Sequence, residues 1–151
     1  MDYEILKDVT LFKGLHKEQL EKILQLAFVK NYKEGFTLFF EDMQGGIMYV
    51  ILKGRIDLYK KNEEGDNKFL VSLGPPEYLG ELSLIEDDTR SATAKISEES
   101  ELLVITRKCF NDMIYKEPKI ASTILLNICK KLSSRLKNMN EKIIKLEEEN
   151  E

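Results

Sequence analysis

A stretch of short β-rich runs, separated by turn signals, extends from Val29 to Arg107 and constrains the fold most strongly. Phe69, Val71 and Leu73 alternate along one of these runs, and a Gly-Pro-Pro turn ends it. Strands at a spacing of about ten residues with glycine turns are typical of an antiparallel sandwich or roll. We expect strands over residues 36–40, 47–52, 56–60, 69–73, 91–96 and 102–106.

Helical periodicity flanks this stretch on both sides. The apolar residues of 8–28 fall on one face of a helix. A short helix is expected over 108–115, and Pro118 stands where a following helix tolerates proline, in its first turn. This order predicts an α+β fold that is mainly β. It is an antiparallel β-roll, jelly-roll-like, with an N-terminal helix, a short helix at 81–85 and two C-terminal helices.

The last helix carries an apolar stripe with heptad spacing. Its members follow one another at alternating intervals of four and three residues: Leu125, Cys129, Leu132, Leu136, Met139, Ile143 and Leu146. The commoner role of such a stripe is to pack a helix on its own domain. The 3.5-residue period and the charged flanks favour instead a parallel homodimer through this 125–146 seam. The chain then divides into 1–117, a binding roll with its N-terminal and short helices, and 118–151, a long dimerisation helix.

Composition narrows the function classes. A net charge of −4 and a pI near 5.3 argue against a dedicated nucleic-acid surface. No run approaches the roughly 18 apolar residues that span a bilayer, and the start has no apolar signal region. Cys109 and Cys129 are isolated thiols, as in reduced compartments, so we expect a cytoplasmic protein. His16 is the single histidine, so we expect no metal site and no enzyme.

The candidate binding site is the stretch GELSLIEDDTRSATA at residues 80–94. Gly80 permits close approach of a ligand to the backbone, and a helical turn after it would present N–H groups to an anion. Arg90 suits bidentate contact with phosphate, and Ser91 adds a hydroxyl. Glu81 would accept a hydrogen bond from a neutral hydroxyl, and together these groups describe a site for a ribose phosphate. On spacing alone, a surface ion pair between Glu81 and Arg90 explains the pattern better.

This stretch resembles the phosphate-binding cassette of the cyclic-nucleotide-binding superfamily, of the catabolite-activator and kinase-regulatory-subunit type. The family pattern is FGE-L-A/G-L, a short loop and R-S/A/T-A, and here it reads LGELSL and, after the loop, RSAT. The upstream EDMQGGIMYVILKGRIDLYK is similar to the family's preceding strands, and the likeness runs from Leu11 to Leu146. Leu79 in place of Phe and Ser83 in place of Ala or Gly depart from the pattern.

The resemblance implies a role for each matching residue. Glu81 would hold the ribose 2′-hydroxyl and Arg90 the exocyclic oxygens of the cyclic phosphate. Asp57 matches an acidic position that pairs with the cassette arginine in kinase regulatory subunits. On the long helix, SRLKNMNEK is similar to the segment that caps adenine, and Asn140 would reach the partner's pocket. The implied ligand-binding residues are Gly80, Glu81, Leu82, Ser83, Arg90, Ser91, Ala92, Met139 and Asn140.

The implied function is that of a sensor that binds a cyclic mononucleotide and passes the signal along the 118–147 helix. The ligand is cAMP in preference to cGMP, because cGMP-selective members often carry Thr where Ser91 stands. No other cofactor, metal, membrane or direct nucleic-acid contact is expected. Two alternatives stay open: the sensor half of a DNA-binding regulator, whose helix-turn-helix is missing from this sequence, and a ligand-free dimerisation module.

Overall fold

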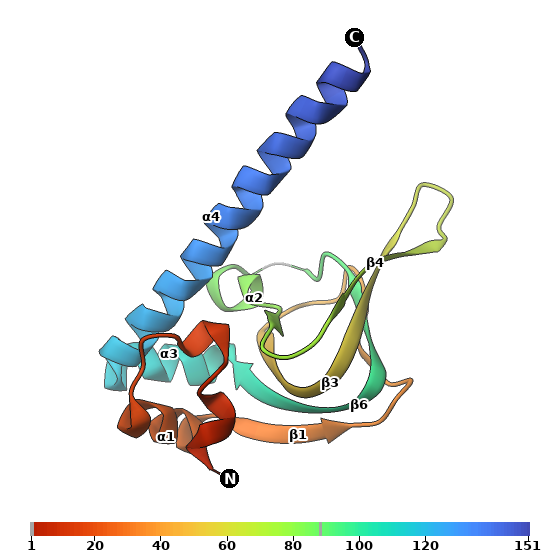
Figure 1. Cartoon of the computed structure of the whole chain (residues 1–151). Helices are drawn as coiled ribbons and strands as arrows, with labels where there is room; N and C mark the ends of the chain where they lie inside the picture. Colours follow the sequence, from red (N-terminus) through yellow and green to blue (C-terminus); the bar gives the residue numbers. More distant parts are fainter. Residues whose placement is uncertain (1, 88) are drawn as a thin grey trace.

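An antiparallel β-roll lies between helices in the computed structural model, which describes residues 2–87 and 89–151 (Figure 1). Two long strands, β3 (Ile47–Lys61) and β6 (Thr93–Thr106), pair along most of their length at the centre of a six-stranded sheet. The strand order is β1-β6-β3-β4, with β2 on β6 and β5 on β3. The shorter strands are β1 (Phe28–Tyr32), β2 (Thr37–Phe39), β4 (Asn67–Leu73) and β5 (Tyr78–Leu79). The predicted fold class is confirmed.

Gly54 bends strand β3 and does not end it, so the prediction of two separate strands here was wrong. Gly54 adopts φ +96°, and a Cβ at this position would lie 2.1 Å from Ser100 Oγ. The register between β3 and β6 shifts on both sides of it, as in a β-bulge. The expected strands 91–96 and 102–106 are likewise joined in β6.

The N-terminal helix is shorter than predicted. Two single turns of 3₁₀ helix, η1 (Tyr3–Leu6) and η2 (Thr10–Phe12), come before α1 (Lys17–Leu26), and β1 begins two residues after α1 ends. Gln19 Oε1 accepts a hydrogen bond of 3.0 Å from the backbone N–H of His16, which caps the helix start. The apolar periodicity over 8–28 thus arises from two kinds of helix that bury their apolar side chains in one core.

The C-terminal helices agree with the sequence pattern. They are α3 (Arg107–Lys116) and α4 (Pro118–Glu149), with Pro118 in the first turn of α4. Thr106 Oγ1 accepts a hydrogen bond from the Cys109 N–H and caps α3. The Cys109 thiol itself donates to the backbone oxygen of Leu26, and burial raises its pKa. This thiol therefore joins α3 to α1 as a structural group.

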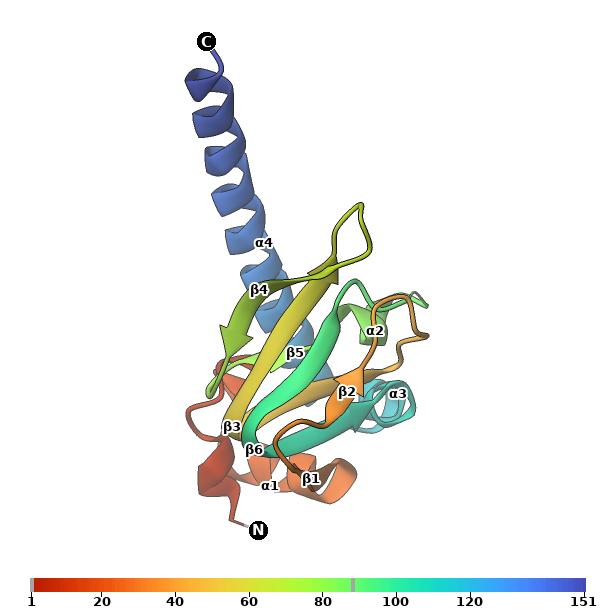
Figure 2. The same ribbon diagram turned by 90° about the vertical axis from the view of Figure 1, so that its right-hand side faces the viewer.

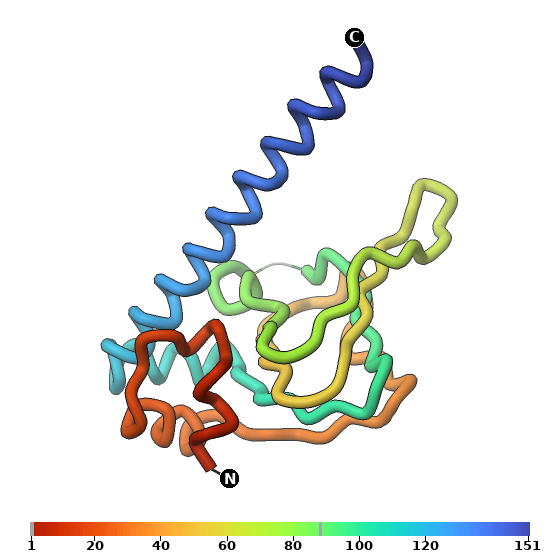
Figure 3. The backbone as a smooth tube through the Cα atoms, viewed as in Figure 1, coloured from red at the N-terminus to blue at the C-terminus, as the bar shows by residue number. Residues whose placement is uncertain are grey.

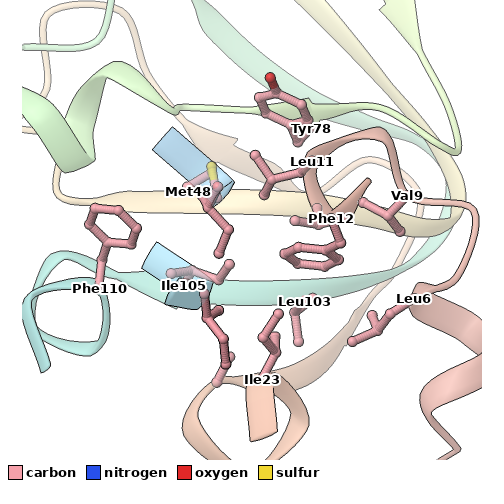
Figure 4. Packing of buried hydrophobic residues seen from close by; sticks show 14 of the residues in the cluster. Leu6, Val9, Leu11, Phe12, Ile23, Met48, Tyr78, Leu103, Ile105 and Phe110 are labelled. Atoms are coloured by element: carbon pink, nitrogen blue, oxygen red, sulfur yellow. The ribbon is translucent and has the colours of Figure 1, made fainter. Parts of the chain in front are cut away.

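The sheet separates two apolar clusters because side chains along a strand alternate between its faces. On β3, Met48 and Val50 belong to the cluster beneath the helices, whereas Tyr49 and Ile51 belong to the cluster inside the roll. Figure 4 shows the first cluster, where side chains converge from η1, η2, α1, β3, β6 and α3. The second cluster forms the inner wall of the roll, against which the candidate site is built.

Helix α4 has a buried half and an exposed half. Ile120, Ala121, Ile124 and Ile128 are at most 2% exposed and complete the first cluster. Beyond them the helix extends away from the roll, as Figures 1 and 2 show. No helix in the described ranges is long and apolar enough to span a membrane. Since the first half of α4 shares the core of the roll, the division at residue 118 stays a prediction about the role of the helix.

Candidate functional site

A cavity of about 200 Å³ opens between the inner wall of the roll, the segment after β5 and helix α4. Figure 3 shows the chain after β5 turning back beneath α4 before it re-enters the sheet. The lining combines apolar side chains with a few charged ones, the usual composition of a small-molecule site. The residues are Phe39, Leu58, Leu73, Tyr78, Leu79, Gly80, Glu81, Leu82, Ser83, Glu86, Thr89, Arg90, Ser91, Ala92 and Arg135.

Gly80 brings the backbone of the cavity wall close to Arg90 and Ile47. Its φ is +81°, and a Cβ would lie 2.6 Å from Arg90 Nη1 and 2.8 Å from the backbone oxygen of Ile47. Only glycine meets both conditions without strain. The helical turn expected after it is present as α2 (Leu82–Ile85), with Glu81 at the N-cap position.

Arg90 is a buried cation at the end of the cassette loop, with 6% of its surface exposed. Nη1 donates to Ser83 Oγ at 3.0 Å and Nη2 to the backbone oxygen of Ile47 at 2.8 Å. The guanidinium lies 4.1 Å from the centre of the Phe39 ring, a cation–π contact. Its Nε is buried without a hydrogen-bond partner among the described residues. Burial lowers the pKa of this arginine.

Within residues 2–87 and 89–151, the charge of Arg90 is not balanced by a carboxylate. No carboxylate in these ranges lies within 4.0 Å of its guanidinium. The surface ion pair with Glu81 that spacing alone favoured is therefore wrong. Both side chains are buried, and each has a different partner. A buried cation with neutral partners is costly unless an anion joins it.

Glu81 pairs with helix α4 instead. It is 4% exposed, and its Oε1 accepts a hydrogen bond of 3.1 Å from Nη1 of Arg135. One turn earlier on α4, Lys131 donates to the backbone oxygen of Tyr78 at 3.2 Å and lies 3.7 Å from the centre of that ring. These two side chains attach α4 directly to the cavity wall.

Burial dominates the electrostatics of this attachment. It lowers the pKa of Lys131, and the nearby Glu81 carboxylate opposes that change. Burial together with Glu81 raises the pKa of Tyr78 to about 12, so its hydroxyl stays neutral in the cavity wall at physiological pH.

The structure brings together seven of the predicted binding residues, all of which line the cavity: Gly80, Glu81, Leu82, Ser83, Arg90, Ser91 and Ala92. At position 83, where the family pattern has Ala or Gly, the serine hydroxyl accepts a hydrogen bond from Arg90. The role of each residue toward a ligand stays a prediction.

The other three predicted residues lie elsewhere. Met139 and Asn140 are on the exposed half of α4 and do not line the cavity of their own chain. Their contact with a partner's ligand stays a prediction. Asp57 forms no ion pair with Arg90, and strand alternation directs it to the side of β3 opposite Leu58, which lines the cavity. Its Oδ1 is buried and has no partner in the described part of the chain.

Arg135 is the cavity-lining residue of α4 that the sequence prediction missed. It stands four residues before Met139, on the same side of the helix, and lies within the SRLKNMNEK segment that the resemblance indicated. A buried Glu81 also requires a positively charged partner. The sequence does not say which turn of α4 crosses the cavity, because that depends on how the helix packs on the roll.

These features define a β-roll with a cavity between a one-turn helix, a buried arginine and a long helix. The family model for the cyclic nucleotide-binding domain matches residues 29–117. The chain therefore belongs to the cyclic nucleotide-binding domain family.

Several known proteins resemble this chain over most of its length. The Cyclic AMP receptor protein of Thermus thermophilus is 29% identical over 127 residues, which are 84% of this chain and 59% of that protein. The human cGMP-dependent protein kinase 2 is 35% identical over 112 residues, 72% of this chain and 15% of the kinase. The crystal structure of the Thermus thermophilus catabolite activator protein superposes with a TM-score of 0.81 at 28% identity, covering 91% of this chain and 62% of that chain.

Replacement of Gly80 by alanine tests the close approach at the cavity. Gly65 is the control, because it has nearly the same φ, +85°, but open space around the added methyl group. We expect Gly65→Ala to lower the free energy of unfolding by about 1–2 kcal/mol through backbone strain. Gly80→Ala is expected to cost about 1–3 kcal/mol more, from the contacts with Arg90 and Ile47. Urea unfolding measures both, and equal losses would contradict the assigned approach.

Proposed function

We propose that this chain is a sensor domain that binds one cyclic mononucleotide, with the cyclic phosphate on Arg90. The observation that carries the proposal is the buried guanidinium in the cavity wall without a carboxylate partner among the described residues. An anion beside Arg90 would balance this charge and give the unpartnered Nε an acceptor. Membership of the cyclic nucleotide-binding domain family supports the same ligand class.

Charge balance favours a ligand with a single negative charge. Glu81 and Arg90 are the buried charged side chains of the wall among the described residues; the half-exposed Arg135 compensates Glu81, and the charge of Arg90 is left over. A cyclic phosphodiester carries one negative charge at neutral pH, whereas a free phosphate monoester carries nearly two. Ser91 and the backbone beside Ala92 would add hydrogen bonds, and Glu81 would accept one from the ribose 2′-hydroxyl.

Arg90→Ala removes the cation of the proposed phosphate site. We expect binding of the cyclic nucleotide to weaken by about 2–5 kcal/mol, as for a buried charge that loses its hydrogen-bonded partner. Arg90→Lys keeps the charge but loses the fork that holds two acceptors, so an intermediate loss is expected. Isothermal titration calorimetry with cAMP measures the affinities, and circular dichroism checks the fold. Unchanged affinity in a folded Arg90→Ala protein would place the phosphate elsewhere.

We further propose cAMP as the preferred ligand. The names of the relatives divide on this point, one being a cyclic AMP receptor and the other a cGMP-dependent kinase. The residue after Arg90 is Ser91, where cGMP-selective members of the family often have threonine. Serine still carries a hydroxyl, so the base end of the site must add to the discrimination. Asn140 of a partner chain has both a donor and an acceptor for the adenine edge.

The preference is tested by competition. One or two hydrogen bonds of roughly 0.5–1.5 kcal/mol each correspond to about ten-fold selectivity. We expect cGMP to displace a fluorescent cAMP analogue only at about ten-fold higher concentration than cAMP does. In Asn140→Ala that ratio is expected to shrink. Displacement by cGMP at equal or lower concentration would reverse the preference, and identical affinities in Asn140→Ala would remove α4 from base recognition.

The exposed half of α4 supports the proposed dimer and the route of the signal. In the single chain, more than half of the surface of each seam residue beyond the roll is exposed, 51–60% for Leu136, Met139, Ile143 and Leu146. Two such stripes paired in parallel would bury them. Through Arg135 and Lys131 the same helix touches the cavity wall, so a ligand that moves the wall would also move the seam.

A double substitution tests the seam. Leu136→Glu with Ile143→Glu places like charges in the paired stripe and is expected to give monomers. The matched control is Leu126→Glu with Ile144→Glu, since both residues are equally exposed apolar positions on α4 outside the seam. Sedimentation velocity is expected to show a dimer for the parent and the control. A monomeric parent, or loss of the dimer in both variants, would contradict the seam.

The coverage of the catabolite activator structure favours a second candidate function. This chain matches 62% of that protein's length, which suits the sensor half of a DNA-binding regulator. Whether the gene's reading frame continues beyond residue 151 into a DNA-binding domain distinguishes this function from that of a separate sensor. Calorimetry without heat of binding for either nucleotide would instead favour a ligand-free dimerisation module. We expect no chemistry on the ligand and a location in the cytoplasm.

A further inference from the structure

We propose that Arg107 is a positioning residue for the proposed nucleotide site, acting on Arg90 through helix α2. Arg107 is the first residue of α3 and does not line the cavity. It therefore lies outside the cassette pattern and outside the set of residues that the sequence predicted. The inference rests on the proposed function, because it concerns the arginine that would hold the phosphate.

The guanidinium of Arg107 donates hydrogen bonds to backbone oxygens of α2 and of the residue that follows it. Nε and Nη2 donate to the oxygen of Ser83 at 3.0 Å and 2.7 Å, and Nη2 also donates to the oxygen of Glu86 at 2.9 Å. Nη1 reaches Asp87 Oδ1 at 3.3 Å. The last carbonyl groups of a helix have no partners within it, and a cation there is favoured by the helix dipole. One side chain thus fastens a helix of only four residues.

Ser83 connects this fastening to the phosphate site. Its backbone oxygen is held by Arg107, while its hydroxyl accepts the bond from Arg90 Nη1. The orientation of Ser83, and with it that of Arg90, therefore depends on how firmly α2 is held. A one-turn helix cannot hold itself, because nucleation costs more than its few internal hydrogen bonds return.

Other contacts hold the opposite side of the loop. The Arg90 N–H donates to the oxygen of Met43 and the Asp42 N–H donates to the oxygen of Arg90, while Gln44 Nε2 donates to Asp87 Oδ1. These bonds hold the loop at Arg90 and Asp87 and do not involve Ser83, whose backbone N–H donates to the oxygen of Gly80 at 3.1 Å. Arg107 supplies the contact at Ser83, from a helix that packs on α4.

Arg107→Ala is the test variant and Arg55→Ala is the matched control. Like Arg107, the Arg55 guanidinium donates to the backbone oxygen of a serine, here Ser72, and it also donates to the hydroxyl of Ser72. Arg55 and Ser72 do not line the cavity. We expect Arg107→Ala to raise the Kd for cAMP about ten-fold, the loss of one charge-assisted contact. Arg55→Ala should change it less than about two-fold, and Arg107→Lys should restore little, because an ammonium cannot span two carbonyl groups.

A double-mutant cycle separates positioning from general support of the fold. In Ser83→Ala, Arg90 no longer depends on the Ser83 hydroxyl, so adding Arg107→Ala should weaken binding by less than about two-fold. A full ten-fold loss in both backgrounds, or equal losses for Arg107→Ala and Arg55→Ala, would overturn the inference. If Arg107→Ala does not fold, Arg107→Lys serves in the same cycle.

Amide hydrogen exchange tests the role of Arg107 independently of nucleotide binding. It therefore distinguishes a failure of this inference from a failure of the proposed function. We expect the amides of residues 82–86 to exchange faster in Arg107→Ala than in Arg55→Ala, with or without nucleotide. If the parent binds neither cAMP nor cGMP, the proposed function fails, while the exchange still reports whether Arg107 holds α2. Unchanged exchange in these amides would overturn the role of Arg107 independently of any ligand.

Discussion

The burial of the Arg90 guanidinium is the constraint on which the arrangement of this domain depends. A charge inside a protein must be solvated by the protein, and here the neighbouring elements each supply one group: a hydroxyl from α2, a carbonyl from β3 and a ring from β2. Gly80 leaves the space that the guanidinium fills. The loop thereby presents a buried cation whose partners in the described part of the chain are neutral, and this is the basis of the proposed anion site.

Helix α4 connects that site to the outside of the molecule. Its first half is part of the apolar core, its middle reaches the cavity through Lys131 and Arg135, and its second half carries an exposed apolar stripe. A change at Glu81 therefore has a short path to the stripe, through one ion pair and a continuous helix. Arg107 offers a second path, since α3 lies between the cassette and α4. Both paths begin at groups that a ligand in the cavity would contact or orient.

Much of the fold was predictable because it is encoded by local periodicity. The alternation in β4, the stop at the Gly-Pro-Pro turn and the proline at the start of α4 each reflect short-range sterics and hydrogen bonding. The errors occurred where long-range contacts override the local signal. Gly54 suggested a turn, but its close approach to Ser100 makes it a bulge within one strand. The pattern over 8–28 suggested one helix, but the segment contains one 3₁₀ turn and a shorter α-helix.

The sequence by itself determined the cassette, because Gly80, Glu81, Ser83 and Arg90 are close along the chain and their chemistry is local. The tertiary structure alone decided the partners of these residues. Glu81 pairs with Arg135 from a helix more than fifty residues away, and Arg90 pairs with no carboxylate among the described residues. Which turn of α4 crosses the cavity depends on the packing of Ile120, Ile124 and Ile128 on the roll. The helical pattern predicts which face of α4 is buried. Which turn of α4 lies at the cavity is fixed only when this face packs on the roll.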